Sequence, residues 1–257
     1  MDCKFTKSSI DSERFARACD AASARVRDGI GTMGEKGIHH ALKHYFEPDT
    51  SCHEVAVGGY IADIVGEDGI IEIQSAGFYR MKDKLSQFLD YARVTIVYPC
   101  VVNKRIIKLD PDSGEVISIR RSPRHKGEYD IFSELRAISQ MAAHERLTVC
   151  IAMLEADEYR CGEKKRRRRN IPNKVEILPT ALTDLIYLRS PEDYLRFLPQ
   201  ELPEQFTSED FSSLCGVKRK QASDALYVLS ALGIVERCGK RGRSYLYCRR
   251  RAESILA

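Results

Sequence analysis

The sequence lacks the features of a membrane protein and of a protein held together by structural zinc or disulfides. No apolar run is long enough to cross a bilayer, and the first residues, MDCK, carry no apolar signal segment. The nine cysteines are scattered without a CxxC pair, and their odd number argues against a closed disulfide framework. We therefore expect a cytoplasmic protein without a membrane partner, in which most cysteines are buried or inert thiols.

The sequence also has little net charge, although its basic residues are concentrated in short stretches. The formal net charge is +4. The basic stretches are 120–126, 164–169, 218–220 and 240–251. Clustered Lys and Arg neutralise backbone phosphates and release counterions, so this distribution indicates nucleic acid as a partner. For any single stretch, a solvated surface is the alternative explanation.

The composition predicts two globular domains. The chain has 257 residues, of which 43% are hydrophobic, so it can form a sizeable core. Pro199 and Pro203 mark the expected linker. We accordingly place one domain at 1–198 and a second at 204–257.

Hydrophobic periodicity predicts that the first domain is α/β. The expected helices cover residues 12–28, 33–45, 82–92 and 129–143. The expected strands cover residues 53–57, 60–65, 70–74, 94–102, 106–109, 116–119 and 147–154, and residues 174–178 and 182–188 continue the first domain. Residues 162–173 are polar and very basic, and we expect them to form an exposed loop.

Acidic side chains on two of these strands are candidates for a metal site. Glu72 and Gln74 are two residues apart on a strand, so they project from the same face. A tight turn at 67–69 returns the chain beside the preceding strand and brings Asp63 next to Glu72. Two carboxylates that meet across strands repel each other, which lowers stability unless a cation lies between them. Hard divalent ions prefer carboxylate oxygens as ligands.

This pattern resembles the PD-(D/E)xK nuclease superfamily, which has the restriction-endonuclease-like fold. The resemblance rests on IADIV at 61–65, a short turn, and IIEIQ at 70–74. The upstream helical segment GEKGIHHALK at 34–43 strengthens it. The resemblance implies a mixed sheet core flanked by helices, and an enzyme that hydrolyses phosphodiester bonds with the help of a metal ion.

The resemblance also implies a set of metal ligands. Asp63, Glu72 and the backbone carbonyl of Ile73 would hold Mg²⁺ or Mn²⁺. Glu35 matches the glutamate that often joins such a site from the first core helix. It would hold a second ion or orient water.

Two residues near these ligands are accessory candidates. His39 follows Glu35 by four residues, so the two side chains share one helix face. A metal-binding or acid–base role for His39 is one interpretation, and a packed or capping histidine, or one that contacts phosphate, is the favoured one. Glu54 could replace Glu35 as an accessory ligand.

The sequence departs from the usual pattern at Gln74, where the superfamily usually carries a lysine. Gln74 can hydrogen-bond the attacking water but cannot act as a cation. A lysine on the following helix would then offset the charge that builds on the phosphate; Lys84 is the first choice and Lys82 the second. The alternatives are a domain that has lost cleavage and only binds, or a strand whose solvent face happens to carry Glu72 and Gln74.

The C-terminal part has the pattern of two helices followed by a basic β-hairpin. A capping sequence at 206–211 opens the first helix, and the second is expected at 218–232. Strands are expected at 234–237 and 244–248. Helix, turn, helix and hairpin together resemble a small winged helix-turn-helix domain.

The winged-helix resemblance implies DNA contacts at the start of the second helix and on the wing. The candidate nucleic-acid-binding residues of this domain are Lys218, Arg219, Lys220, Gln221, Lys240, Arg241 and Arg243. A further candidate is the run Lys165, Arg166, Arg167 and Arg168, as a clamp on the DNA backbone. A nuclear localisation signal is the compositional alternative for that run.

These observations favour a metal-dependent nuclease that acts on DNA, with RNA as the alternative substrate, and with the winged helix positioning the substrate. Two other functions stay open: a catalytically inactive DNA-binding regulator, and a protein-assembly module on a nuclease-like fold. A homodimer is compatible with the cutting of both strands, since that reaction needs two sites.

Overall fold

The computed structural model describes residues 10–28, 37–166 and 169–250. The chain forms two compact units, and each unit is built from segments that are separate in the sequence. The first unit comprises residues 1–75, 97–127 and 151–186, and the second comprises 76–96, 128–150 and 187–257. The chain therefore passes repeatedly between the units. The domain boundaries expected at 198 and 204 stay a prediction.

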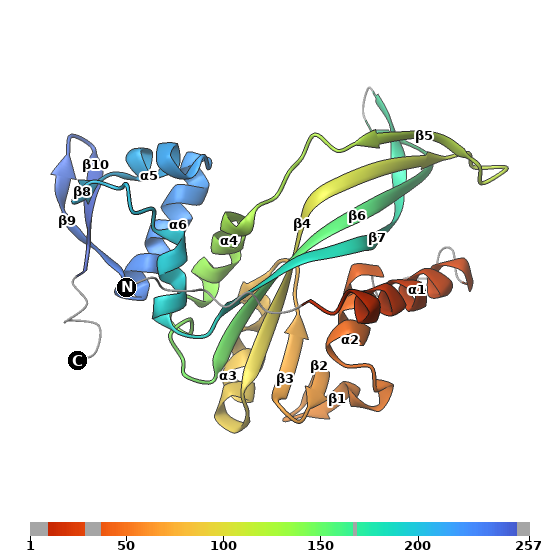
Figure 1. The fold of residues 1–257 in the computed structure, drawn as a ribbon, viewed down its shortest axis with the longest axis horizontal. Coiled ribbons are helices and arrows are strands. Elements are labelled where there is room, and N and C mark those ends of the chain that lie inside the picture. Colours follow the sequence, from red (N-terminus) through yellow and green to blue (C-terminus); the bar gives the residue numbers. More distant parts are fainter. Residues whose placement is uncertain (1–9, 29–36, 167–168, 251–257) are drawn as a thin grey trace. The chain divides into compact units, whose positions relative to one another are not determined.

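The described residues contain a seven-stranded sheet (Figure 1). Its strands are β1 (His53–Val57), β2 (Tyr60–Gly66), β3 (Gly69–Ile73), β4 (Val94–Leu109), β5 (Val116–Arg121), β6 (Leu147–Arg166) and β7 (Arg169–Leu188). The strand order is β1-β2-β3-β4-β6-β7, and β5 pairs with β4 outside this path. The chain thus has the expected α/β class, with a large mixed sheet flanked by helices.

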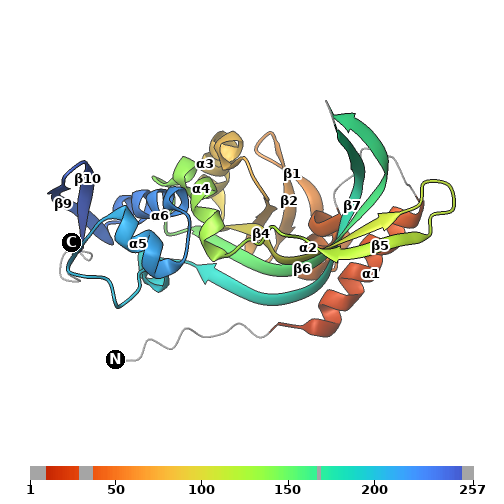
Figure 2. The ribbon, with the colours of Figure 1, turned by 90° about the horizontal axis from the view of Figure 1, so that it is seen from above.

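Two helices of the first unit, α1 (Ser12–Asp28) and α2 (Gly37–Phe46), pack against each other (Figure 2). Phe15 and Tyr45 meet edge to face, with ring centroids 5.6 Å apart. Small buried side chains such as Ala18 allow the two helices to approach closely. This packing fixes α2, which carries several candidate site residues.

The first residue of α2 lies directly against β7. A Cβ atom on Gly37 would lie 2.9 Å from the carbonyl oxygen of Ile177, so only glycine fits there. The Gly37 amide also donates a hydrogen bond to Oε1 of Glu176 at 3.2 Å. The start of α2 is therefore held by both shape and hydrogen bonding.

The second unit consists of short helices and a small sheet. Its α-helices are α3 (Lys82–Tyr91), α4 (Phe132–Leu135), α5 (Ser208–Cys215) and α6 (Arg219–Ala231). Its 3₁₀ turns are Phe78–Met81, Glu128–Ile131, Arg136–Ile138 and Pro191–Phe197; a further turn, Thr50–Cys52, precedes β1 in the first unit. The small sheet has the order β8-β10-β9 and contains β8 (Gln205–Phe206), β9 (Val235–Arg241) and β10 (Ser244–Arg249).

Aromatic side chains join the C-terminal helices to the α4 region within the second unit. The Tyr129 ring centroid lies 5.4 Å from that of Phe197 and 6.1 Å from that of Phe211. The Tyr129 hydroxyl donates to the carbonyl oxygen of Phe197 at 3.0 Å. Burial raises the pKa of Tyr129, so this hydroxyl stays protonated and remains a donor at neutral pH.

A buried carboxylate on α6 is neutralised by two basic side chains. Asp224 is 2% exposed, and its carboxylate accepts from Arg136 at 3.1 Å and from Lys220 at 2.7 Å. A buried charge is tolerated only when it is paired and hydrogen-bonded. Asp224 therefore ties α6 to the α4 region of the same unit.

Most of the expected elements are present, with boundaries that differ by a few residues. The helix expected at 12–28 is confirmed as α1, and the helix at 82–92 as α3. The strand series between 53 and 74 is confirmed as β1, β2 and β3. The strands expected at 94–102 and 106–109 form one strand, β4, because backbone pairing continues through the polar residues between them.

The single helix expected at 129–143 is wrong. The segment forms 3₁₀ turns on either side of the short helix α4 and then a series of turns. Phe132, Leu135 and Ile138 are buried and lie three residues apart, a spacing that suits a 3₁₀ helix as well as an α-helix. The Ser133 hydroxyl donates to the carbonyl oxygen of Asp130, which competes with regular helical bonding.

The basic loop expected at 162–173 is also wrong for the described residues. Residues 162–166 belong to β6 and residues 169–173 to β7, whereas Arg167 and Arg168 lie outside the described residues. The two strands are hydrogen-bonded neighbours in the sheet, and backbone pairing extends a strand whatever the polarity of its residues. Side-chain patterning therefore gave no sign of the strand ends.

Most of the described cysteines are only half-buried. Every cysteine of the described residues is a free thiol. Burial raises the pKa of Cys19 to about 11, so its thiol stays protonated and weakly nucleophilic at neutral pH. None of the described helices combines the length and the apolar character that a membrane span needs.

Glu134 provides a test of how the turn before α3 is stabilised. Its Oε2 atom accepts hydrogen bonds from the amides of Gly77 at 2.6 Å and Phe78 at 3.1 Å. Glu134→Ala removes this acceptor, so we expect the free energy of unfolding to fall by about 1–3 kcal/mol. Urea unfolding monitored by circular dichroism measures the change. The control is Glu115→Ala, an exposed residue, and equal midpoints for the two variants would contradict the assignment.

Asp210 makes the stability of the C-terminal helices sensitive to acid. The Thr207 amide donates to its carboxylate at 2.8 Å, and this bond holds the pKa of Asp210 below its usual value. A lowered folded-state pKa contributes stability that is present above about pH 4 and lost as the pH falls through the folded-state value. We expect Asp210→Asn to lower stability at pH 7 and to have a smaller effect at pH 3. Urea unfolding at both pH values tests this, and an equal difference at the two values would refute it.

Candidate functional site

The pairing of β2 with β3 brings Asp63 beside Glu72. The ladder pairs Ile64 with Ile71 and Val65 with Ile70, and one step further along this register Asp63 faces Glu72. Directly opposite residues of neighbouring strands project from the same face of the sheet. The register therefore places the two expected acidic side chains together.

The two carboxylates accept backbone hydrogen bonds across the strand pair. The Asp63 amide donates to Oε1 of Glu72 at 3.2 Å, and the Ile73 amide donates to Oδ2 of Asp63 at 2.7 Å. Each carboxylate thus occupies the place that a carbonyl oxygen would have in a regular ladder. Glu72 is 5% exposed, so its charge depends on such partners.

Helix α2 contributes a histidine to this cluster. Nε2 of His39 lies 3.1 Å from Oδ2 of Asp63, the same oxygen that receives the Ile73 amide. The sequence suggested His39 only as an accessory residue. Its position beside Asp63 makes it a residue that orients this carboxylate.

One turn further along α2, a buried lysine pairs with an acidic residue of β1. The Lys43 ammonium lies 3.0 Å from Oε1 of Glu54; the Lys43 side chain is 4% exposed and that of Glu54 is 66% exposed. Glu54 has a φ of 53°, a left-handed conformation that is uncommon for residues other than glycine. Sequence reasoning missed Lys43, although its spacing of four residues from His39 predicts a shared helix face.

The structure gives the following surroundings for the other expected site residues that it describes. The Gln74 amide donates to the carbonyl oxygen of Val97 at 2.9 Å, which continues the sheet from β3 to β4. Lys84 lies on α3 in the second unit, with its ammonium 5.4 Å from the centroid of the Phe88 ring. Glu35 lies outside the described residues. Within the described ranges, no group of three or more His, Cys, Asp or Glu side chains has the geometry of a metal site.

The residues expected to bind nucleic acid include some that form ion pairs within the chain and others that are exposed to solvent. Arg219 pairs with Glu209 at 2.8 Å, Lys220 pairs with Asp224, and Arg241 pairs with Asp210. Lys218, Lys240 and Arg243 are exposed, and Gln221 accepts a hydrogen bond from the Lys218 amide. Lys165 and Arg166 lie in β6 with side chains that are not described, and Arg167 and Arg168 lie outside the described residues.

The module α5, α6, β9 and β10 therefore presents an exposed positive surface from its helix start and its hairpin. Because Arg219, Lys220 and Arg241 are already paired within the chain, their charge is partly neutralised before any ligand arrives. Lys240 and Arg243 on the hairpin are the clearest candidates for contact with an anionic partner.

Comparison with known proteins places these residues in a family. Residues 36–189, more than half of the chain, match the model described as a domain of unknown function, DUF8091. A protein of Treponema pallidum (strain Nichols), described as an uncharacterized protein, is 32% identical over 222 residues, which cover 85% of this chain and 86% of the relative. No solved structure matches. The chain therefore belongs to the DUF8091 family, whose matched region contains β1–β7 and the cluster of Asp63, Glu72 and His39.

Proposed function

We propose that this protein is a metal-dependent nuclease that hydrolyses phosphodiester bonds in DNA. The single observation that carries the proposal is the juxtaposition of the Asp63 and Glu72 carboxylates across β2 and β3. The order of α2, β1–β3, α3 and β4 also supports a restriction-endonuclease-like fold. Paired carboxylates on adjacent strands are the arrangement that a hard divalent cation favours.

The chemistry of the cluster fits Mg²⁺ or Mn²⁺. Mg²⁺ usually keeps several water molecules and needs only one or two carboxylates from the protein, so a third acidic neighbour is not required. Asp63 and Glu72 would hold the ion together with the carbonyl oxygen of Ile73, and Glu35 is the further ligand that the sequence offers. When bound, the ion would lower the pKa of a water molecule and polarise the phosphate.

The residues of the chain would orient the reacting groups. His39 contacts Oδ2 of Asp63 and limits the rotation of this carboxylate. Gln74 would hydrogen-bond the attacking water, and Lys84 would offset the charge that develops on the phosphate. Lys43, which shares a face of α2 with His39, is a second source of positive charge.

We further propose that the C-terminal module is a winged helix-turn-helix that positions the DNA. The order α5, α6, β9, β10 supports this assignment, with Gly216 in the left-handed conformation between the helices. The exposed Lys240 and Arg243 would contact phosphates from the wing.

A DNA-binding protein without catalytic activity is the second candidate. One observation favours it: Gln74 stands where the nucleases of the resembling superfamily usually carry lysine. Such a protein would bind DNA through the basic C-terminal module but would not hydrolyse it. Cleavage assays of the wild-type protein and of its carboxylate variants separate the two functions.

Removal of either carboxylate charge is expected to slow cleavage strongly. We expect Asp63→Asn and Glu72→Gln to lower the rate of plasmid cleavage with Mg²⁺ or Mn²⁺ by roughly 100-fold, because each loses a metal-binding charge. Both substitutions keep an oxygen that accepts the backbone amide, so the hairpin should fold. Agarose-gel assays of supercoiled and single-stranded DNA measure the rate.

The matched control is Asp68→Asn, in the exposed turn of the same hairpin. It should cleave at the wild-type rate. If the wild-type protein binds DNA but cuts no substrate with either metal, the nuclease proposal fails and the binding function stands. Cleavage that survives in both Asp63→Asn and Glu72→Gln would also exclude this site.

Removal of the wing charges is expected to weaken DNA binding in a salt-dependent manner. We expect the double variant Lys240→Ala, Arg243→Ala to bind DNA of any sequence more weakly. The slope of log K against log salt should fall by about 1 for each phosphate that the wing no longer neutralises. Fluorescence anisotropy at several salt concentrations measures the slope. The control Arg80→Ala, another exposed arginine of the second unit, should leave it unchanged. If the double variant has the same salt slope as the wild-type protein, the wing does not contact DNA phosphates.

A further inference from the structure

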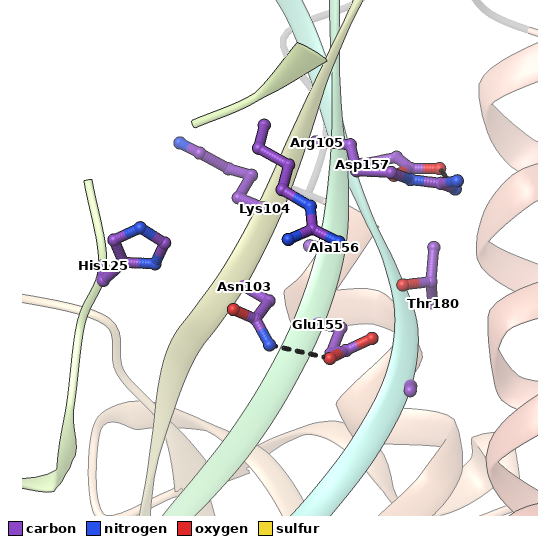
Figure 3. Close-up of a pocket in the computed structure, with 10 residues that line it drawn as sticks. Asn103, Lys104, Arg105, His125, Glu155, Ala156, Asp157 and Thr180 are labelled. Atoms are coloured by element: carbon purple, nitrogen blue, oxygen red, sulfur yellow. Dashed lines mark hydrogen bonds and ion pairs between the residues drawn. The ribbon is translucent and has the colours of Figure 1, made fainter. Parts of the chain in front are cut away.

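A polar cavity of about 410 Å³ lies in the first unit and shares no lining residue with the Asp63–Glu72 cluster. Its walls come from β4, β6 and β7, the end of β5 and the segment that follows β5 (Figure 3). The volume is in the range of pockets that bind small organic molecules, and the lining is dominated by charged and polar side chains.

Two arginines of this cavity are placed directly opposite each other. Arg105 on β4 and Arg121 on β5 are register partners in the antiparallel pair. Partner side chains project from the same face, and two like charges in this arrangement repel each other. An anion shared by both guanidinium groups would remove the repulsion.

A buried carboxylate holds one of these arginines in place. Asp157 accepts from Nε of Arg105 at 2.7 Å and from Nη2 at 2.6 Å. The Asp157 side chain is 7% exposed and that of Arg105 is 58% exposed, so the carboxylate fixes a guanidinium that still reaches solvent. Among the described residues this two-point pair uses Nε and Nη2 of Arg105, and the Nη1 atom can donate to a further acceptor.

The second arginine, Arg121, has no ion pair or hydrogen bond of its side chain within the described part of the chain. The Asp157 carboxylate is already used by Arg105, so the Arg121 guanidinium can donate to a ligand. His125 lines the same cavity and adds a further group that can donate to an anion. One side of the cavity is therefore suited to phosphate, which arginine recognises through paired hydrogen bonds.

The remaining wall offers hydrogen-bond acceptors. Asn103 donates to Oε1 of Glu155 at 2.9 Å, and Thr180 projects from β7 beside them (Figure 3). In the view of Figure 3, His125 and Thr180 lie on opposite sides of Asn103 and Glu155. The carboxylate of Glu155 can accept from hydroxyl or amino groups of a ligand whose anionic end lies at the arginines.

We propose that this cavity binds a nucleotide-sized organic phosphate, with the phosphate between Arg105 and Arg121 and the hydroxyl or amino groups directed to Glu155 and Thr180. The site is separate from the proposed nuclease site and does not depend on it. A concave cavity of this volume suits a small molecule, whereas a DNA strand would track along an open surface.

Isothermal titration calorimetry of the full chain tests the proposal, with adenosine 5′-monophosphate as the probe. Adenosine, inorganic phosphate and a short single-stranded oligonucleotide are separate arms. We expect the nucleotide to bind more tightly than adenosine or phosphate, since it uses both ends of the cavity. Arg121→Ala should weaken nucleotide binding by about tenfold or more, and Arg121→Lys by less, because lysine keeps the charge but not the paired donors.

The matched control is Arg120→Ala, which removes the same charge from the neighbouring exposed residue of β5. Arg120 projects to the opposite face of the strand, so nucleotide binding should be unchanged. If Arg121→Ala and Arg120→Ala weaken nucleotide binding equally, the effect comes from the loss of positive charge in general, and the proposed site is wrong. Binding of the oligonucleotide through Arg121, with no binding of the nucleotide or of phosphate, would show a nucleic-acid surface instead. No binding of the nucleotide would also overturn the proposal.

Discussion

A carboxylate that is removed from water must receive hydrogen bonds or a cation, and this constraint organises the hairpin of β2 and β3. Asp63 and Glu72 satisfy this constraint because their carboxylates accept hydrogen bonds from backbone amides, which in a regular ladder would donate to carbonyl oxygens. Both acids are consequently held at fixed positions on one face of the sheet, and His39 adds a third contact from α2. The proposed metal chemistry requires this rigidity, since a metal site tolerates little movement of its ligands.

Other buried charged side chains are also stabilised by hydrogen-bonded partners. Lys43 with Glu54, Asp157 with Arg105, and Asp224 with Arg136 each join a side chain that is less than 10% exposed to one that is about half exposed or more. The buried member gains a partner, and the outer member loses rotational freedom. Such pairs hold long, flexible side chains in fixed orientations at the surface, which lowers the entropy cost of binding a ligand.

The sequence allowed the meander and the meeting of its two acids to be predicted, because side-chain alternation and a tight turn determine strand register. It placed Lys43 on the helix face of His39 but gave no sign that Lys43 is buried, since a lysine on a short helix normally projects into water, and no sign of the left-handed conformation of Glu54. The full lengths of β6 and β7 were hidden for a different reason: charged residues on a paired strand follow no apolar pattern. The Arg105–Arg121 pair depended on the β4–β5 register, which the sequence left undetermined.

The close approach of Gly37 to β7 has a consequence for how the protein is made. Gly37 and its hydrogen-bond partner Glu176 are 139 residues apart, so this contact at the start of α2 forms only after most of the chain has been synthesised, whereas the contacts of α2 with α1 can form earlier. Contacts of such long range slow folding and leave apolar surface open in the growing chain. In the nascent protein, the helix that carries His39 and Lys43 can therefore pack on α1 while its first residue still lacks its contact with the last strand of the sheet.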